Sequence, residues 1–254
     1  MIDSSLRIEH LQAFAKEKQI LYDISCRFEK GKVTVLMGPN GSGKSTLAHV
    51  IMGDPKYTTA QNAKTHVSGL FLNKKNILNL PTEEKARLGL FLSFQSPIAI
   101  PGVSVKELLR ASFQNKKGSN NKSVSALNTR ISFFAKTLHI DPNLLNRAIH
   151  EEFSGGERKK IELLQALILQ PAFAIFDEID TGVDVDALKI IAKGVRELQK
   201  QGSGIVLITH SERILQYIEV DTVMVMVKGK MTHVGSRELI DRINRNGYRD
   251  LNTL

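Results

Sequence analysis

Nine residues, GPNGSGKST at positions 38–46, restrict the fold more than any other segment of this 254-residue chain. They follow the apolar run VTVLM at 33–37 and fit the spacing Gly-x4-Gly-Lys-Ser in full. Glycines allow backbone N–H groups to turn toward phosphate oxygens, and the N-terminus of a helix adds partial positive charge. The segment predicts a buried strand, a phosphate-binding loop and a helix that runs from near Lys44 to Met52.

The loop residues also predict how a nucleoside triphosphate and its magnesium ion would be held. The Lys44 ammonium is expected to reach the β- and γ-phosphates, and the Ser45 hydroxyl is expected to bind Mg²⁺. The residues expected to surround the phosphates are Gly38, Pro39, Asn40, Gly41, Ser42, Gly43, Lys44, Ser45 and Thr46. A chance glycine-rich turn is the alternative, and the strand–loop–helix setting argues against it.

Two adjacent acids follow a second apolar run, AFAIF at 172–176. Asp177 is expected to bind the magnesium ion, directly or through water, and Glu178 to orient an attacking water molecule. Acids after a buried strand also begin ordinary loops. The interpretation of this pair therefore depends on the phosphate loop earlier in the chain.

Three further features lie in a fixed order around these two motifs. Gln95 ends the run LFLSFQ, and His210 ends the run LITH. Between them, Ser154, Gly155 and Gly156 open a helical pattern and predict a second anion-binding turn, although Ser-Gly-Gly alone is also a common helix cap. Each of the three is weak by itself, and the order in which they occur is what carries the argument.

The alternation of apolar patterns predicts an α/β fold with a mainly parallel sheet. Residues 6–11 and 20–28 alternate with period two, as strands exposed on one face do. The helix-rich segment at about 97–170 is expected to form a lobe inserted between two halves of the sheet, with a polar exposed loop at 115–124. Further strands are expected at 33–37, 90–95, 172–176, 204–209 and 220–227, a hairpin with its turn at 73–76, and helices at 81–89, 104–114, 125–140, 154–169, 185–200 and 236–243.

Composition narrows the class of protein. The chain is 42% hydrophobic, enough for one core, or for one core with a small helical lobe, and it carries a formal net charge of +9. Its single cysteine, Cys26, allows no intrachain disulfide and no four-thiolate cluster. The residues MIDSSLRIEH at 1–10 have no apolar segment, so secretion is not expected, and no apolar run approaches the ~20 residues of a membrane helix. A cytoplasmic protein without direct membrane insertion is expected.

Taken in order, these motifs resemble those of the ATP-binding cassette (ABC) ATPases, over nearly the whole chain. The resemblance implies one ABC domain over residues 1–254, with a RecA-like parallel sheet core, an antiparallel β subdomain and the helical lobe inserted within it. It also implies ATP and Mg²⁺ as ligands. The implied roles are catalysis by Glu178, His210 and Lys44, metal contacts from Ser45, Gln95 and Asp177, a signature at 153–157 with Ser154, Gly155 and Gly156, and a D-loop at 180–184.

The family pattern implies dimerisation, because the signature of one copy completes the ATP site of a second copy. The sequence also departs from that pattern. The signature has Phe153 in place of leucine and Glu157 in place of glutamine. Where an aromatic ring usually stacks on adenine, the chain has Ala15 with Phe14 beside it, so base selectivity is expected to be loose.

Five separated segments are similar to the SufC family, the ATPases of the SUF iron–sulfur cluster assembly system. They are SFQSPIAIPGVSV, FSGGERKKIELLQAL, DEIDTGVDVDALKIIAKGV, THSERIL and NGYRDL. The resemblance implies SufB- and SufD-type scaffold partners, docking at residues 95–103 and the helical lobe, and a location in the cytoplasm or the plastid stroma. Lys159 is hypothesised to pair with Glu178 and to hold it away from water before dimerisation.

Two other classes remain open. The chain is also compatible with the nucleotide-binding subunit of an ABC transporter, which would use the same docking surface. The charge of +9 raises the possibility of a DNA-associated cassette. Such proteins usually carry long coiled-coil insertions between the two nucleotide motifs. The sequence has no heptad run there, so nucleic acid is not an expected partner.

Overall fold

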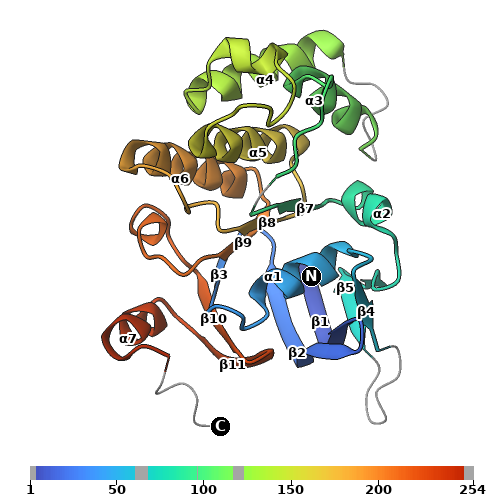
Figure 1. Cartoon of the computed structure of the whole chain (residues 1–254), viewed down its shortest axis with the longest axis vertical. Helices are drawn as coiled ribbons and strands as arrows, with labels where there is room; N and C mark the ends of the chain where they lie inside the picture. The colour runs from blue at the N-terminus through green and yellow to red at the C-terminus, as the bar shows by residue number, and fades with distance from the viewer. Residues whose placement is uncertain (1–3, 61–67, 96, 117–122, 249–254) are drawn as a thin grey trace.

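The computed structural model describes residues 4–60, 68–95, 97–116 and 123–248. It has two β-sheets with helices between and above them (Figure 1). The larger sheet has the strand order β11-β10-β3-β9-β8-β7, and its strands are parallel except for β11. These strands are β3 (Val33–Met37), β7 (Leu90–Ser93), β8 (Phe173–Asp177), β9 (Gly204–Ile208), β10 (Thr222–Val227) and β11 (Lys230–Gly235).

The second sheet is antiparallel and has the order β2-β1-β5-β6, with β4 also paired to β1. In its long strands, buried residues are interspersed with partly buried ones in β1 and with partly buried or exposed ones in β2, because only one face of this sheet lies on the core. The members are β1 (Ser5–Ala15), β2 (Lys18–Glu29), β4 (Tyr57–Thr59), β5 (Gly69–Leu72) and β6 (Lys75–Asn76).

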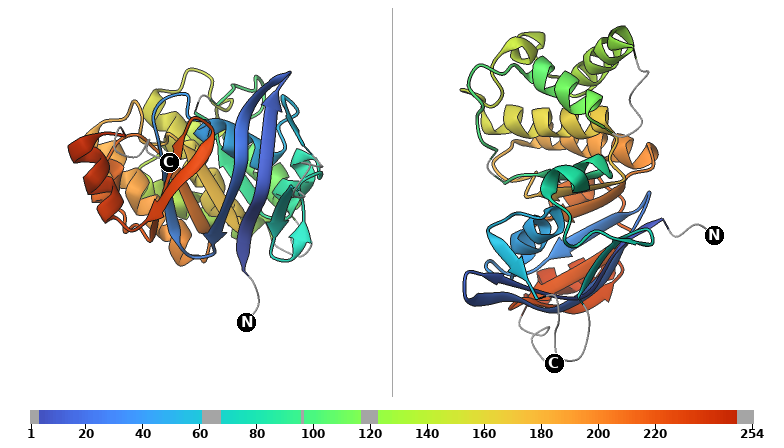
Figure 2. Two further views of the ribbon diagram at one scale, coloured as in Figure 1. Left: turned by 90° about the horizontal axis from the view of Figure 1, so that it is seen from below. Right: turned by 90° about the vertical axis from the view of Figure 1, so that its right-hand side faces the viewer.

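The parallel sheet divides the interior into two apolar clusters, because alternate residues of its strands face opposite sides. One helix, α1, lies between the two sheets, where Leu47 and Ile51 are buried with strand residues of both. The opposite face of the parallel sheet is covered by α5 and α6, and α3 and α4 pack above α5 (Figures 1 and 2). The α-helices are α1 (Lys44–Met52), α2 (Thr82–Arg87), α3 (Val105–Gln114), α4 (Val124–Thr137), α5 (Gly155–Leu169), α6 (Val185–Lys200) and α7 (Glu238–Asn246).

The central strands of the parallel sheet have continuous apolar sequences because both faces of the sheet are covered. Every residue of β3, β8 and β9 is buried, since helices cover one face and α1 with the antiparallel sheet covers the other. Two of the covering helices begin with capping boxes: Ser104 with Glu107 opens α3, and Ser154 with Glu157 opens α5. The expected α/β architecture with a mainly parallel sheet is therefore the observed one.

Several boundaries differ from the sequence predictions. The strand expected at 90–95 ends at Ser93, so Phe94 and Gln95 leave the sheet. The hairpin turn is shorter than expected, because Asn73 adopts a positive φ of 57° and β6 already begins at Lys75. Strands β4 and β11 were not anticipated; β4 is short, and β11 carries Lys, Thr and His in place of an apolar pattern. Residues 66–67, 117–122 and 249–251 of the predicted segments lie outside the described residues.

One buried histidine gives the fold a pH dependence. The His150 side chain is 4% exposed and packs edge-on against Phe153, with 6.1 Å between ring centroids. Its Nδ1 atom has no hydrogen-bond partner among the described residues. Burial, helped by the charges of Arg158 and Lys159, lowers the pKa of His150 to about 4. The folded chain therefore holds a neutral imidazole where the unfolded chain would bind a proton.

We predict that His150→Asn weakens the acid sensitivity of the fold. Between pH 6.5 and pH 4 the unfolded chain binds more protons at this site, so wild-type stability falls as pH falls, by up to about 3 kcal/mol. Asparagine does not titrate and tolerates the positive φ of 61° at this position. Urea unfolding from pH 4 to pH 7 measures the slope. His139→Asn is the control, since His139 is exposed and also has a positive φ, of 50°; equal slopes in both variants would contradict the prediction.

Candidate active site

The loop between β3 and α1 has the backbone expected of a phosphate-binding loop. Gly38, Gly41 and Gly43 have φ angles of 152°, 75° and 101°. At Gly38 a Cβ atom would lie only 2.1 Å from the Met226 carbonyl oxygen, so the loop could not follow this path with a larger residue. The sequence predicted a helix from near Lys44 to Met52, and α1 has these bounds.

The N-terminus of α1 is open to an anion. Its N-cap residue is Gly43, and no side chain caps it. The first N–H groups of a helix lack intrahelical acceptors, and they attract negative charge. The loop and this helix end border a cavity of about 520 Å³, lined by Ile20, Asn40, Gly41, Ser42, Gly43, Lys44, Ser45, Thr46, Gln95, Glu178 and His210.

Lys44 is folded back onto the loop that carries it. Its Nζ atom donates to the carbonyl oxygens of Gly38 at 2.8 Å and Pro39 at 3.1 Å. Burial lowers the pKa of Lys44, while the nearby Glu178 and Asp177 carboxylates act in the opposite direction. The carbonyl oxygens of the loop thus accept hydrogen bonds from the Lys44 ammonium. In a complex with a nucleotide, the ammonium would donate to phosphate oxygens instead.

Asp177 ends β8 beside the first turn of α1. Its carboxyl accepts a hydrogen bond from the Ser45 hydroxyl, and its Oδ1 atom is buried without a partner among the described residues. Burial raises the pKa of Asp177. An unpaired buried carboxylate oxygen next to a hydroxyl fits a magnesium ion, which takes one or two protein ligands and completes its shell with water and phosphates. The described residues contain no cluster of three His, Cys, Asp or Glu that could hold a metal alone.

Three residues predicted from separate motifs meet at the mouth of the cavity. The Gln95 Nε2 atom donates to Glu178 Oε2 at 2.6 Å, and His210 Nδ1 lies 3.3 Å from Glu178 Oε1. Glu178 itself has a positive φ of 53°, an uncommon backbone conformation for a glutamate. The turn after β8 therefore aims this carboxylate into the cavity, between a group from the end of β7 and one from the end of β9.

The signature residues lie elsewhere. None of Ser154, Gly155 and Gly156 is among the residues that line this cavity, and the first two are exposed. The Ser154 hydroxyl donates to the Glu157 carboxylate at 2.7 Å, and the Ser154 backbone N–H donates to the same oxygen at 2.8 Å. These bonds lower the pKa of Glu157. The Glu157 carboxylate thereby completes the capping box that opens α5, a role in which glutamate and glutamine are both suitable.

The hypothesised pair between Lys159 and Glu178 is not present. Lys159 Nζ donates instead to the carbonyl oxygens of Phe94 at 3.3 Å and Gln95 at 3.1 Å. The hypothesis failed because Lys159 lies on the buried side of α5, against the end of β7. Glu178 takes Gln95 and His210 as its partners.

Sequence reasoning missed several residues that support the site. Thr209 donates its hydroxyl to Asp180 at 2.8 Å, which holds the D-loop against the end of β9. The Tyr248 hydroxyl accepts the Gly38 backbone N–H at 3.2 Å. Ile20 lines the cavity, whereas Phe14 and Ala15 do not. Glu162 was also missed, although the sequence shows it as an acid on the apolar side of the helix at 155–169; it accepts hydrogen bonds from Ser93 and from the Phe94 backbone N–H, next to Gln95.

Fold and site together define a phosphate-loop nucleotide-binding domain. A family model described as "ABC transporter" matches residues 21–181. A "Probable ABC transporter ATP-binding protein" of Streptococcus pyogenes is 41% identical over 96% of this chain and 94% of its own length. A "Probable ATP-dependent transporter ycf16" of Trieres chinensis is also 41% identical, over 96% of both chains. The chain belongs to the ABC transporter family, and it is an ATPase of that family.

Solved structures agree with this assignment. A nucleotide-free ATP-binding cassette from an ABC transporter is 28% identical, covers 95% of both chains and superposes with a TM-score of 0.73. The dimeric structure of MJ0796, a bacterial ABC transporter cassette, shares the fold with a TM-score of 0.73 at 18% identity, over 91% of this chain and 98% of that one. Among the residues described for this protein, no helix combines the length and apolar character needed to cross a membrane.

We predict that Gly38→Ala weakens nucleotide binding at least tenfold. The added methyl group would meet the Met226 carbonyl and force the loop away from the path that its N–H groups need. Gly31→Ala is the control, because Gly31 also has a positive φ, of 74°, yet has open space around it and lies outside the loop. Titration with a fluorescent ATP analogue measures both variants. Equal affinities in the two would contradict this account of the loop.

Proposed function

We propose that the chain is the ATP-hydrolysing subunit of an iron–sulfur cluster assembly complex of the SUF type. The observation that carries the ATPase mechanism is the convergence of Gln95, Glu178 and His210 at the mouth of the phosphate-loop cavity. The assembly role rests on the five SufC-like segments of the sequence. ATP and water would give ADP and phosphate.

Each site residue has a role that its position supports. Lys44 would leave the Gly38 and Pro39 carbonyls and donate to the β- and γ-phosphates. Ser45, Asp177 and Gln95 would hold Mg²⁺. When bound, the ion neutralises charge on the β- and γ-phosphate oxygens. The glycines and N–H groups of residues 38–46 would surround the phosphates.

Glu178 is suited to orient the attacking water and to accept its proton. Its carboxylate reaches the cavity but is held by Gln95 on one oxygen and by His210 on the other. Both partners would turn toward the nucleotide on binding, His210 toward the γ-phosphate and Gln95 toward the metal. That exchange would release the carboxylate for water. Positioning and charge stabilisation account for most of the catalysis in this class of reaction.

We also propose that two copies associate around ATP. Ser154, Gly155 and Gly156 open α5 as an exposed helix N-terminus that does not border the chain's own phosphate-loop cavity. A second copy could present this turn to the γ-phosphate, with its Ser154 hydroxyl released from Glu157. The structure of MJ0796, a cassette of the same fold, is dimeric, which supports the association of two copies.

We predict that Glu178→Gln forms a stable dimer in the presence of ATP. Glutamine keeps the shape of the side chain but cannot accept the proton from water, so bound ATP persists. Light scattering with and without ATP measures the association. Adding Ser154→Ala to the same chain is expected to weaken dimerisation about tenfold, through loss of a charge-assisted hydrogen bond. A double variant that associates as well as Glu178→Gln would contradict the proposed role of the signature.

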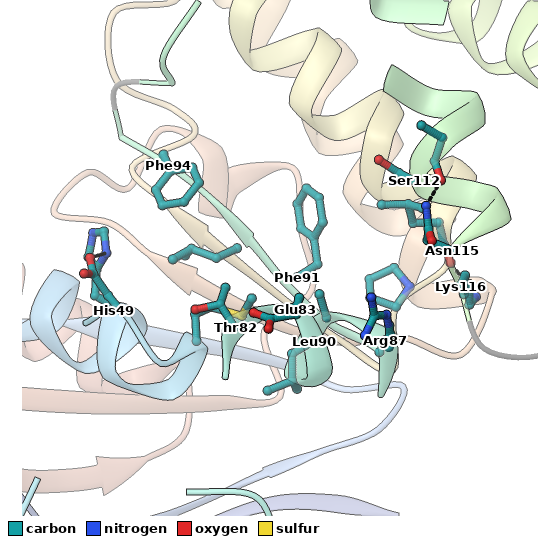
Figure 3. A pocket seen from close by; sticks show the side chains of 18 of the residues that line it. His49, Thr82, Glu83, Arg87, Leu90, Phe91, Phe94, Ser112, Asn115 and Lys116 are labelled. Atoms are coloured by element: carbon teal, nitrogen blue, oxygen red, sulfur yellow. Dashed lines mark hydrogen bonds and ion pairs between the residues drawn. The ribbon is translucent and has the colours of Figure 1, made fainter. Parts of the chain in front are cut away.

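The docking surface that we propose includes residues 95–103 and a second cavity beside them. A cavity of about 720 Å³ opens between α1, α2 and α3, and β7 contributes Leu90, Phe91 and Leu92 to it together with Phe94 (Figure 3). Arg87 and Lys116 lie at one end of this cavity. Such a lining suits a helix with an apolar face, and we assign it to a SufB- or SufD-type scaffold.

Neighbouring residues support the same surface. Ile98 is 83% exposed, and Ile100 is exposed as well, on the irregular segment that follows Gln95. Residues 97–102 contain neither helix nor strand. We propose that this segment and the helices within about 97–170 act as one helical subdomain inside a single ABC domain of residues 1–254. Scaffold docking would then bear directly on Gln95 and on the signature.

The single cysteine fits a subunit that does not ligate the cluster itself. Cys26 lies in β2 and packs against the core, and burial raises the pKa of its thiol to about 12. A thiol with so high a pKa is a poor metal ligand at neutral pH, since the thiolate is the ligating form. Cluster ligands would have to come from the scaffold proteins, in the cytoplasm or in a plastid stroma.

Affinity capture from native cells followed by mass spectrometry tests the assignment. We predict that SufB- and SufD-type proteins co-purify with the chain and are lost with Ile98→Asp. Val234→Asp is the control, because Val234 is 61% exposed on β11, outside residues 95–103 and the helical lobe. The second candidate, a transporter subunit, is favoured by the names of the relatives in Streptococcus pyogenes and Trieres chinensis. Recovery of integral membrane proteins in place of the scaffold would establish that candidate and overturn the first.

A further inference from the structure

Two charged side chains of α5 are buried in the interior, one helical turn apart. The Lys159 and Glu162 residues are 6% and 4% exposed. Neither belongs to the phosphate-loop cavity or to the cavity assigned to the scaffold. Residues of these types are almost never fully buried unless they are paired, so the partners of this pair are informative.

Together the two side chains bond to three consecutive residues at the end of β7, and both bond to the middle one, Phe94. Glu162 accepts a short hydrogen bond from the Ser93 hydroxyl and another, at 3.3 Å, from the Phe94 backbone N–H. Lys159 donates to the carbonyl oxygens of Phe94 and Gln95. We name this set of four bonds the 159/162 clamp. It fixes residues 93–95, where the chain leaves the parallel sheet, to the first two turns of α5.

Burial opposes the charged forms of both groups. It raises the pKa of Glu162 to about 7 and lowers the pKa of Lys159, so each group is displaced toward its neutral form. The desolvation penalty of buried charged groups can offset their attraction, so their burial is weak evidence for a stabilising role. Groups that are costly to bury and yet held by four defined hydrogen bonds are candidates for positioning other groups.

The residues at the two ends of the clamp are those that contact the nucleotide in the proposed mechanism. On the β7 side, the Gln95 side chain donates to Glu178. On the α5 side, Lys159 follows Ser154, Gly155 and Gly156 within about one and a half turns of helix. Phe94, whose backbone the clamp holds on both sides, also lines the cavity assigned to the scaffold. The clamp therefore joins three sites that otherwise belong to separate elements.

We infer that Lys159 and Glu162 are positioning residues that keep Gln95 of one ATP site and the signature turn of the other in a fixed relation. A shift of residues 93–95 would move the N-terminal end of α5 with it. A partner that binds against Phe94 and displaces residues 93–95 would then change the positions of Gln95 in one ATP site and of the signature turn in the other. This inference rests on the proposed function, in that it assumes the signature serves a second copy.

Kinetics of the full chain test the clamp. Glu162→Gln and Lys159→Met each remove part of it, and we expect kcat to fall about tenfold, as for loss of hydrogen bonds to charged groups. The affinity for a fluorescent ATP analogue should stay within about twofold, because the phosphate loop is not touched. The double variant should lose little more than either single variant, since both act on one segment. Lys160→Met is the matched control, one position along α5 on its partly exposed side.

The melting temperature separates positioning from a structural role. A clamp that only positions should leave the melting temperature unchanged or raised in Glu162→Gln. Unchanged kcat in both variants would overturn the inference. So would a fall in kcat that comes with an equal loss of ATP affinity and a lower melting temperature, because that pattern marks a structural role.

A second measurement keeps the inference distinct from the proposed function. In chains carrying Glu178→Gln, ATP-dependent dimerisation should weaken about tenfold when Glu162→Gln is added, by the same hydrogen-bond estimate. Failure of Glu178→Gln itself to dimerise would refute the proposed dimer and, with it, the link between two ATP sites. Dimerisation that is strong in both chains would leave the proposed dimer standing and overturn the clamp.

Discussion

In a parallel sheet all strands end at the same edge, and the chemistry of this protein depends on that constraint. Lys44 begins α1 after the loop that follows β3, Asp177 ends β8 and Glu178 comes next, and His210 comes two residues after β9. Because these strands are neighbours in the order β3-β9-β8-β7, residues far apart in the sequence meet at one cavity. In open α/β sheets, ligands bind beside this carboxyl edge of the strands.

The charged groups at this edge bond to neighbouring protein groups, and a bound nucleotide would replace several of these contacts. Lys44 bonds to its own loop carbonyls, Glu178 to Gln95 and His210, and Asp177 keeps one buried oxygen without a partner among the described residues. Burial shifts the pKa values of Lys44 and Asp177 toward the neutral forms. Phosphate oxygens near Lys44 and a divalent ion near Asp177 would each favour the charged form of their partner. Binding of the two together would therefore stabilise the charged forms of both residues.

Motifs with a fixed backbone requirement were predictable. The glycines of the phosphate loop need positive φ angles, and continuous apolar runs suit strands covered on both faces, so β3, β8, β9 and α1 were anticipated. Contacts between distant segments were not. Lys159 was expected to reach Glu178 and instead bonds to residues 94 and 95, because its direction depends on how α5 packs against β7. Strand β4 was missed because its pairing, and not its composition, makes it a strand.

The sequence by itself determined the α/β class, the phosphate loop and the identity of the acids and the histidine near it, because local spacing and backbone conformation specify them. Only the tertiary structure decided which of these groups touch. The end of β7 at Ser93, the positive φ of Glu178 and the burial of Lys159 with Glu162 all arise from the packing of α5 and the strands against one another. Packing of this kind joins segments about 70 residues apart, as the bonds of Glu162 to Ser93 and Phe94 do, and no local pattern encodes it.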